Sequence, residues 1–226
     1  MMKPILTIII STFLVACGSG GAAGGSTQPQ QPNTETILAY GDSTMYGLGG
    51  STPPTATINQ NLLAAGLPDA VENLAIRGAQ LHELLAGRDG RNPPLVQSLQ
   101  GKPAARYVLE NFGINEAGTL LGLEIYKSSV RLFIQTVRSA GKTPVIVTPT
   151  PIFVPNEAVM ALFAQIVQTA RNVASEEGVS IIDVTAQFQD ATRADLVDVV
   201  HPNSQFYKRV ADFEAAELIK LIRQRK

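Results

Sequence analysis

The alternation of two apolar patterns is the feature that most constrains the fold of this chain. From residue 36 onward, short and nearly continuous apolar runs alternate with longer segments whose apolar residues recur every three or four positions. Continuous runs are typical of parallel strands covered on both faces, and the longer spacing is typical of amphipathic helices. Because strand and helix alternate five times, the sequence predicts an α/β fold, a three-layer α/β/α sandwich around a five-stranded and mostly parallel sheet. The expected strands are residues 37–40, 71–75, 107–112, 143–148 and 180–184.

Two internal helices and one C-terminal helix carry apolar stripes that we expect to pack on the sheet rather than to form binding sites. Gly141 and Gly178 are the expected ends of the first two helices, and the third begins at about Asn203. The three stripes are Val130, Phe133, Ile134 and Val137; Met160, Phe163, Ala164 and Val167; and Ala211, Ala215, Leu218, Ile219 and Ile222.

The N-terminal segment is typical of an export signal followed by a tether. Lys3 precedes an apolar run over residues 5–15, which is shorter than the ~20 residues that span a bilayer as a helix. Residues 14–17, Leu-Val-Ala-Cys, are similar to the bacterial lipobox, and this resemblance implies that Cys17 is lipidated and anchors an exported protein to a membrane of the cell envelope. Residues 17–33 contain no charge and few apolar side chains, which predicts a flexible tether. The expected organisation is a signal peptide at 1–16, a lipidated tether at 17–33 and one domain at 34–226.

Composition narrows the chemistry of that domain. Eighteen Lys and Arg residues balance nineteen Asp and Glu residues, so the chain lacks the basic field that holds a phosphate backbone, and we expect no nucleic-acid partner. Cys17 is the only cysteine, which excludes an internal disulfide and a thiolate zinc site. His82-Glu83 opens like a zinc-binding helix, but Ala86 stands where the second histidine would be needed. We therefore expect neither a metal nor a cofactor.

Polar residues that follow the first two strands are candidates for a site, because ligands bind beyond the carboxyl ends of parallel strands. Ser43, in Gly41-Asp42-Ser43, could be a nucleophile above a helix N-terminus or could belong to an ordinary capped turn. Gly78 could point its N–H at an oxyanion or could serve a tight turn.

Two later motifs add an amide and an imidazole. Asn115, in Gly113-Ile114-Asn115, could donate its side-chain amide to the same oxyanion or could cap a helix. Asp198 precedes His201 by three residues, so its carboxylate can accept the Nδ1–H bond and leave Nε2 free to take a proton from a hydroxyl. The alternative for this pair is a cap ahead of the last helix.

Taken in order, these four motifs resemble the blocks of the SGNH subgroup of the GDSL esterase and lipase family. The resemblance covers essentially the whole predicted domain and implies a serine esterase on a flavodoxin-like sheet. It implies Ser43 as nucleophile, His201 as general base and then acid, and Asp198 as the residue that orients His201. It also implies an oxyanion hole made by the Ser43 N–H, the Gly78 N–H and the Asn115 side chain. The intervals between the blocks are similar to those of compact members, of the thioesterase I and lysophospholipase type, with little room for a lid domain.

Two positions depart from the family pattern. Thr44 replaces the leucine that gives the family its name, and Glu116 follows Asn115 where aspartate is commoner. The first change raises a question about local packing, and the second about the orientation of Asn115.

The sequence leaves the ester open. The substrate could be a carbohydrate O-acetyl ester, or a long-chain lysolipid or thioester. Residues 148–155, stiffened by three prolines, could wall the acyl or leaving-group side of a pocket or be a plain connection. A third alternative is a tethered binding lipoprotein on an esterase fold that has lost its activity.

Overall fold

The structure of the protein is a computed structural model that describes residues 36–68 and 70–224. The predicted signal peptide, Cys17 and the tether lie outside the described residues. The strands are β1 (Thr36–Gly41), β2 (Ala70–Asn73), β3 (Ala105–Asn111), β4 (Thr143–Val147) and β5 (Ser180–Ile182). The helices are α1 (Ser43–Tyr46), α2 (Pro54–Ala64), α3 (Leu81–Ala86), α4 (Leu95–Gln100), α5 (Ile114–Gly118), α6 (Leu123–Ser139), α7 (Glu157–Glu177), α8 (Val184–Gln187), the 3₁₀ turn η1 (Arg193–Asp195) and α9 (Ser204–Arg223).

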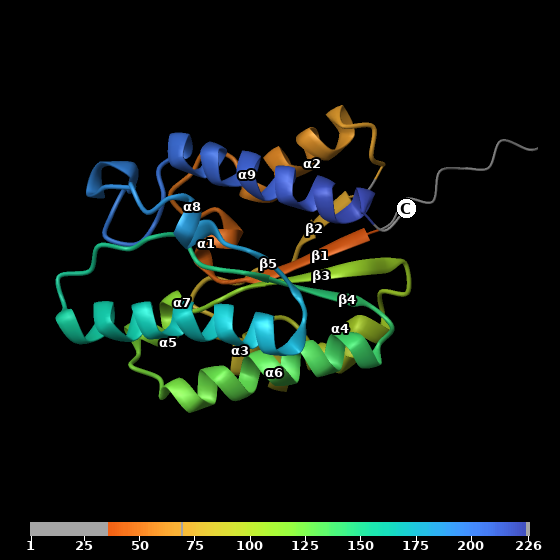
Figure 1. Cartoon of the computed structure of the whole chain (residues 1–226), viewed down its shortest axis with the longest axis horizontal. Helices are drawn as coiled ribbons and strands as arrows, with labels where there is room; N and C mark the ends of the chain where they lie inside the picture. The colour runs from red at the N-terminus through yellow and green to blue at the C-terminus, as the bar shows by residue number, and fades with distance from the viewer. Residues whose placement is uncertain (1–35, 69, 225–226) are drawn as a thin grey trace, which may run out of the picture. The chain divides into compact units, whose positions relative to one another are not determined.

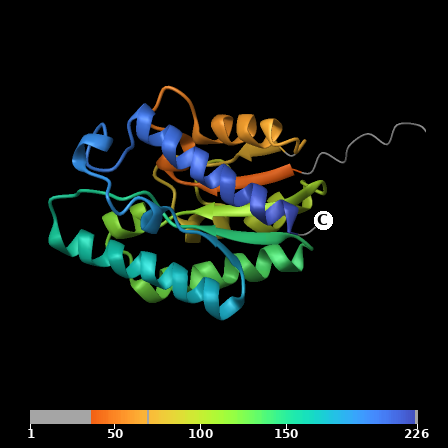
Figure 2. The same cartoon turned by 45° about the horizontal axis from the view of Figure 1, so that its top comes forward.

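The strands form one parallel sheet in the order β2-β1-β3-β4-β5, which is the flavodoxin-like order. Helices α2 and α9 cover one face, and α3, α6 and α7 cover the other (Figure 1). The turned view of Figure 2 keeps the same two groups on opposite sides of the strands. The predicted three-layer sandwich around a five-stranded parallel sheet is therefore confirmed.

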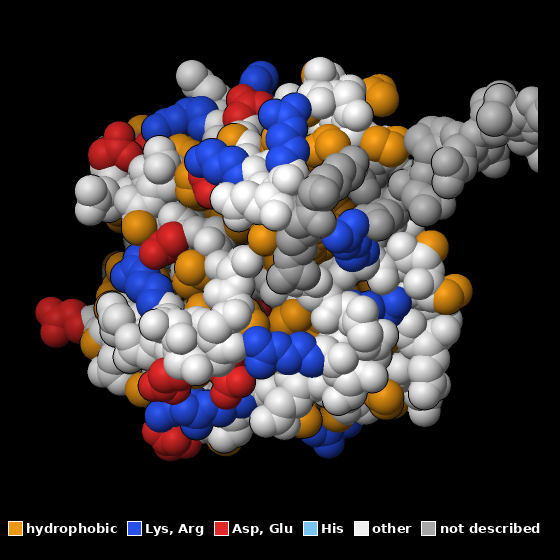
Figure 3. Space-filling model, turned by 45° about the vertical axis from the view of Figure 1, so that its right-hand side comes forward, with side chains coloured by type: hydrophobic (Ala, Val, Ile, Leu, Met, Phe, Trp, Pro, Cys, Tyr) orange, Lys and Arg blue, Asp and Glu red, His pale blue; other side chains and the backbone are white. Residues whose placement is uncertain are grey.

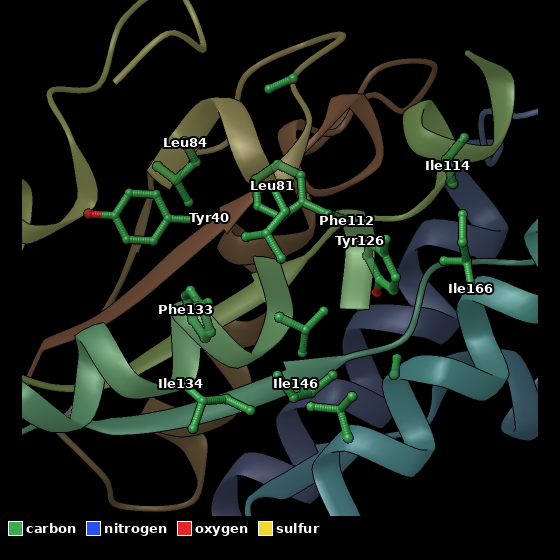
Figure 4. Close-up of a cluster of buried hydrophobic side chains, with 14 of the residues drawn as sticks. Tyr40, Leu81, Leu84, Phe112, Ile114, Tyr126, Phe133, Ile134, Ile146 and Ile166 are labelled. Carbon is green, nitrogen blue, oxygen red and sulfur yellow. The ribbon is translucent and has the colours of Figure 1, made fainter. Parts of the chain in front are cut away.

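Two apolar cores follow from the alternation of side chains along each strand. In β1, Ile37 and Ala39 face α2 and α9, whereas Leu38 and Tyr40 face α3, α6 and α7. Figure 4 shows the second of these cores, in which side chains from the strands pack against side chains from the covering helices. Among them are Tyr40, Leu81, Leu84, Phe133 and Ile146. Both faces of the sheet are buried, which explains the continuous apolar runs in the sequence.

Several predicted bounds and one apolar stripe differ from the structure; strand β3, for example, begins at Ala105 and not at residue 107. Strand β2 ends at Asn73, two residues early, because the Asn73 side chain accepts the N–H of Ala75 and turns the chain. Strand β5 ends at Ile182, because Asp183 caps α8. In the predicted stripe of α7, Phe163 and Val167 are buried, but Met160 is only partly buried and Ala164 is exposed; the buried face continues through Ile166, Ala170 and Val173.

The surface in view carries mixed charge. Acidic and basic side chains occur together on the face shown in Figure 3, and apolar side chains lie scattered among polar ones. Within residues 36–68 and 70–224, no helix combines the length and the apolar character needed to cross a bilayer.

Glu214 of α9 provides a test of this packing. Its side chain is buried, its Oε2 atom has no hydrogen-bond partner among the described residues, and burial raises its pKa to about 8. The folded state therefore binds a proton that the unfolded chain releases above its lower pKa, so stability falls as pH rises from about 4.5 to about 8. We expect Glu214→Gln to remove this loss and to raise the free energy of unfolding by roughly 4–5 kcal/mol at pH 8.5, with little change at pH 4.

Urea denaturation of both proteins across this pH range measures the effect. Glu217→Gln, one turn away in α9 and partly exposed, is the matched control. Parallel stability curves for the wild type and Glu214→Gln would contradict the prediction.

Candidate active site

The end of β1 positions Ser43. A Cβ atom at Gly41 would meet Met45 Cβ at 2.7 Å and the Asn111 carbonyl at 2.8 Å, so this close approach between the end of β1, α1 and β3 admits only glycine. The chain then turns directly into α1, which begins at Ser43. β1 lies between β2 and β3, and this is the point in the sheet where ligands of such folds bind. Helix α1 has only four residues, so individual N–H groups matter here more than a helix dipole.

A buried polar network explains the threonine at position 44. Asp42 Oδ1 accepts the Thr44 N–H and lies 2.8 Å from the Thr44 hydroxyl, which is also 3.2 Å from Asn111 Oδ1. Asn111 in turn donates its amide to the carbonyls at the end of β4, 3.3 Å away. The hydroxyl that replaces a leucine side chain is therefore satisfied, and it links the β1 turn to the centre of the sheet.

Ser43, His201 and Asp198 lie in one chain of hydrogen bonds. Ser43 Oγ is 2.9 Å from His201 Nε2, and His201 Nδ1 is 2.7 Å from Asp198 Oδ2. Asp198 Oδ1 accepts the N–H groups of Val200 and His201 at 2.8 Å each. Partial burial raises the pKa of Asp198, but the hydrogen bonds from the His201 ring and from these two N–H groups outweigh it and lower the pKa to about 2. Asp198 is therefore ionised at neutral pH and holds Nδ1 as the protonated nitrogen.

The loop that carries His201 is fixed on two sides. Val197 N–H donates to the His201 carbonyl at 2.9 Å, which closes the loop on itself. Phe153 N–H donates to the Val199 carbonyl at 2.8 Å and thus joins this loop to the proline-rich segment after β4. The backbone that carries the His201 side chain is consequently held by hydrogen bonds within its own loop and from the proline-rich segment.

The start of α9 holds the same region from a third side. Asn203 caps the helix by accepting the Phe206 N–H. Tyr207 then donates its hydroxyl to the Leu48 carbonyl, 2.9 Å away, in the segment that follows α1. The helix that follows His201 is thus bonded to the segment directly after the helix that begins at Ser43.

The predicted oxyanion donors face the same cavity as Ser43 and His201. Gly78 is the third residue of a turn closed by a bond from the Ala79 N–H to the Ile76 carbonyl, and its φ of +79° requires glycine. Among the described residues, the Gly78 N–H donates no backbone hydrogen bond, so it is available to a ligand. Asn115 uses one amide hydrogen to bond the Ala79 carbonyl at 2.9 Å, and its second hydrogen remains for a ligand.

Glu116 fixes the orientation of Asn115. Its two carboxylate oxygens accept the N–H groups of Leu81 and Gly113, at 2.8 Å each, so the loop after β2 is bonded to the loop after β3. Burial raises the pKa of Glu116 to about 7 despite these hydrogen bonds, and it raises that of Asp42 to about 6. Burial and the neighbouring Glu116 raise the pKa of Glu110 well above its usual range, so the acids beneath the site carry reduced negative charge near neutral pH.

The cavity has a volume of about 540 Å³ and a mixed lining. Its polar lining includes Ser43, Gly78 and Asn115, together with Arg77. Its apolar lining includes Ile114, Ile152, Val154, Val159 and Val200. Ile152 and Val154 belong to the proline-rich segment, which therefore forms a wall of the cavity.

Some sequence candidates lie elsewhere, and some site residues carried no sequence signal. His82 of α3 does not line the cavity, and its Nδ1 atom is buried without a partner among the described residues. Within the part of the chain that the structure describes, no group of three or more His, Cys, Asp or Glu residues could hold a metal ion. Arg77 and Asn156 line the cavity, but neither belongs to a motif that could have marked it in advance.

Comparisons with known proteins identify the family of the chain. A model of the GDSL-like Lipase/Acylhydrolase family matches residues 39–209, a span that includes all four motif blocks. No curated protein sequence matches the chain. A structure assigned to the SGNH hydrolases, from Slackia heliotrinireducens, is 21% identical with a TM-score of 0.67, over 82% of this chain and 100% of that one.

Two further solved structures share the fold. A lipase/acylhydrolase from Enterococcus faecalis is 17% identical with a TM-score of 0.65, over 82% of this chain and 95% of its own. A variant of the acetylxylan esterase Axe2 from Geobacillus stearothermophilus is 18% identical with a TM-score of 0.65, over 81% and 93%. Because the family match spans more than half of the sequence, the chain belongs to the GDSL-like lipase/acylhydrolase family and is an ester-hydrolysing enzyme.

Proposed function

We propose that this chain is a serine esterase that cleaves carboxylic esters through an acyl-serine intermediate. The 2.9 Å contact between Ser43 Oγ and His201 Nε2, with Asp198 on the other ring nitrogen, is the observation that carries the proposal. In this arrangement the ring nitrogen that faces the hydroxyl is unprotonated and can accept its proton. Asp198 remains ionised and stabilises the imidazolium that forms.

The reaction has two halves. Ser43 Oγ attacks the ester carbonyl while His201 takes its proton, and the carbonyl oxygen gains the negative charge. The N–H groups of Ser43 and Gly78 and the second amide hydrogen of Asn115 stabilise that charge. His201 then gives the proton to the leaving alcohol, and water repeats the sequence to release the acid and restore Ser43.

The apolar residues that line the cavity favour an acyl chain of several carbons over acetate. Each buried methylene contributes about 0.8 kcal/mol of binding, and an acetyl group would leave most of this surface unused. Lysolipids and thioesters are therefore the first candidate substrates. Carbohydrate O-acetyl esters are the second, because an acetylxylan esterase shares the fold.

We also propose that the enzyme is exported and anchored to the cell envelope through lipid on Cys17, with residues 1–16 as signal peptide, residues 17–33 as tether and residues 34–226 as the hydrolase domain. The support is the order of sequence features: Lys3, an apolar run, small residues, one cysteine and an uncharged tether. A tether of this kind would let the hydrolase reach substrates close to the membrane.

Replacement of the nucleophile tests the proposed function. We expect Ser43→Ala to lower kcat/KM for 4-nitrophenyl esters by about 10⁴-fold or more, because no other group can form the acyl intermediate. The substrates are a series from acetate to decanoate, and for the wild type we expect a maximum beyond acetate. Ser128→Ala, an exposed serine on α6, is the matched control. Turnover by Ser43→Ala at the wild-type rate would refute the mechanism, and no turnover by the wild type at any length would favour a binding lipoprotein.

The oxyanion hole gives a second test. We expect Asn115→Ala to lower kcat by about 10²–10³-fold with a small change in KM, because its amide acts mainly on charge that develops in the transition state. The bond from Asn115 to the Ala79 carbonyl is also lost, so thermal unfolding must accompany the kinetics. Asn172→Ala, on the exposed side of α7, is the control for loss of an asparagine. An unchanged kcat would remove Asn115 from the proposed hole.

The anchor has its own test. We expect the full-length chain, expressed in a bacterium, to incorporate labelled palmitate and to partition into detergent, and Cys17→Ser to lose both properties. Stable anchoring to a membrane needs two acyl chains, and Cys17→Ser removes the residue that would carry them. The loss of the protein from the detergent phase should therefore be nearly complete. Ser19→Ala, two residues away, is the control. Equal partition of Cys17→Ser and the wild type would contradict the anchor.

A further inference from the structure

Arg77 is the one permanently charged residue among those that line the cavity. It directly precedes Gly78 in the turn from Ile76 to Ala79, so its side chain starts one residue from a proposed oxyanion donor. The backbone of this turn is fixed to β1, because Ile76 N–H donates to the Gly41 carbonyl at 3.0 Å. Arg77 is an exposed residue, and it lines the same cavity as Ser43 and Asn115.

The guanidinium is positioned but not neutralised. It lies over the ring of Tyr46, 5.5 Å from the centroid, and Tyr46 is the last residue of the helix that begins with Ser43. Within residues 36–68 and 70–224, Arg77 forms no ion pair with a carboxylate and no side-chain hydrogen bond. Its donors are consequently available to a ligand, and the aromatic contact reduces the entropy lost on binding.

The rest of the lining cannot supply a counter-charge. The lining contains no aspartate or glutamate, and the nearby Asp198 is engaged with His201. Arginine binds carboxylates and phosphates through paired N–H groups, and it binds them best where no protein carboxylate competes. A neutral ester would leave this cation with only its aromatic neighbour and water.

We propose that Arg77 is a specificity residue that binds an anionic group, a carboxylate or a phosphate, on the ester substrate. This inference rests on the proposed serine esterase function and narrows its substrate class. The substrate then has two unlike parts: an apolar chain against Ile152 and Val154, and an anionic group at Arg77. The anion could belong to the leaving alcohol or to the far end of the acyl chain, and the two sources are distinguished by the experiment.

The experiment compares matched esters that differ in one charge. For the leaving group, the pair is 4-butanoyloxy-3-nitrobenzoate and neutral 2-nitrophenyl butanoate. For the acyl group, the pair is mono-4-nitrophenyl adipate and neutral 4-nitrophenyl hexanoate. For each pair, the measured quantity is kcat/KM for the anionic ester divided by kcat/KM for the neutral ester. For one of the pairs, we expect this ratio to be about tenfold lower in Arg77→Gln than in the wild type, mainly through a change in KM. Arg77→Lys should keep part of the ratio, and 0.5 M NaCl should lower the ratio of the wild type more than that of Arg77→Gln.

Arg88→Gln is the matched control, because it removes the same charge from an exposed residue that does not line the cavity. The inference is overturned if neither ratio depends on Arg77, or if Arg88→Gln lowers the ratio as much as Arg77→Gln, which would indicate long-range steering by net charge. These results leave the serine mechanism intact as long as the neutral esters are hydrolysed in a Ser43-dependent way. Turnover of the neutral esters without Ser43 would instead refute the proposed function itself.

Discussion

The parallel pairing of β1 with β2 on one side and β3 on the other is the constraint on which the rest of the structure depends. Parallel strands bring their carboxyl ends to one edge, so the segments after these three strands must meet there. The serine, the glycine turn and the asparagine come from these three segments. The order of the strands thus brings the three residues together, although they are far apart in the sequence.

Strand order alone would leave the segments loose at that edge, and polar bonds between them supply the precision. Asn73 donates its amide to the Met45 carbonyl, 3.0 Å away, and so joins the end of β2 to α1. Asn115 and Glu116 join the segments after β2 and β3, through the Ala79 carbonyl and the Leu81 N–H. These bonds require polar and acidic side chains in a buried place, which is why the pKa of Glu116 is raised. Burial of these polar groups lowers the stability of the fold, but their hydrogen bonds fix the geometry of the site.

The sequence predicted the parts of this protein that depend on periodicity and on spacing. Continuous apolar runs located all five strands, because both faces of the sheet are covered, and the three-residue interval between Asp198 and His201 fits the hydrogen bond that the structure contains. Strand ends were less predictable, since a single side chain such as Asn73 can turn the chain before the apolar run ends. Arg77 could not be recognised at all, because its importance comes from what is absent around it, and only the three-dimensional lining reveals that. Thr44 appeared as a departure from a pattern, and one of the two partners of its hydroxyl, Asn111, comes from another strand.

The distance along the chain between Ser43 and His201 has a consequence for when the enzyme can act. The two residues are separated by 158 positions, and α9, whose Tyr207 bonds the Leu48 carbonyl, is the last helix in the sequence. A chain that is still being synthesised, or one that is kept unfolded, has the serine but not the base beside it. The contact between Ser43 and His201 can therefore form only after nearly nine-tenths of the chain has been synthesised.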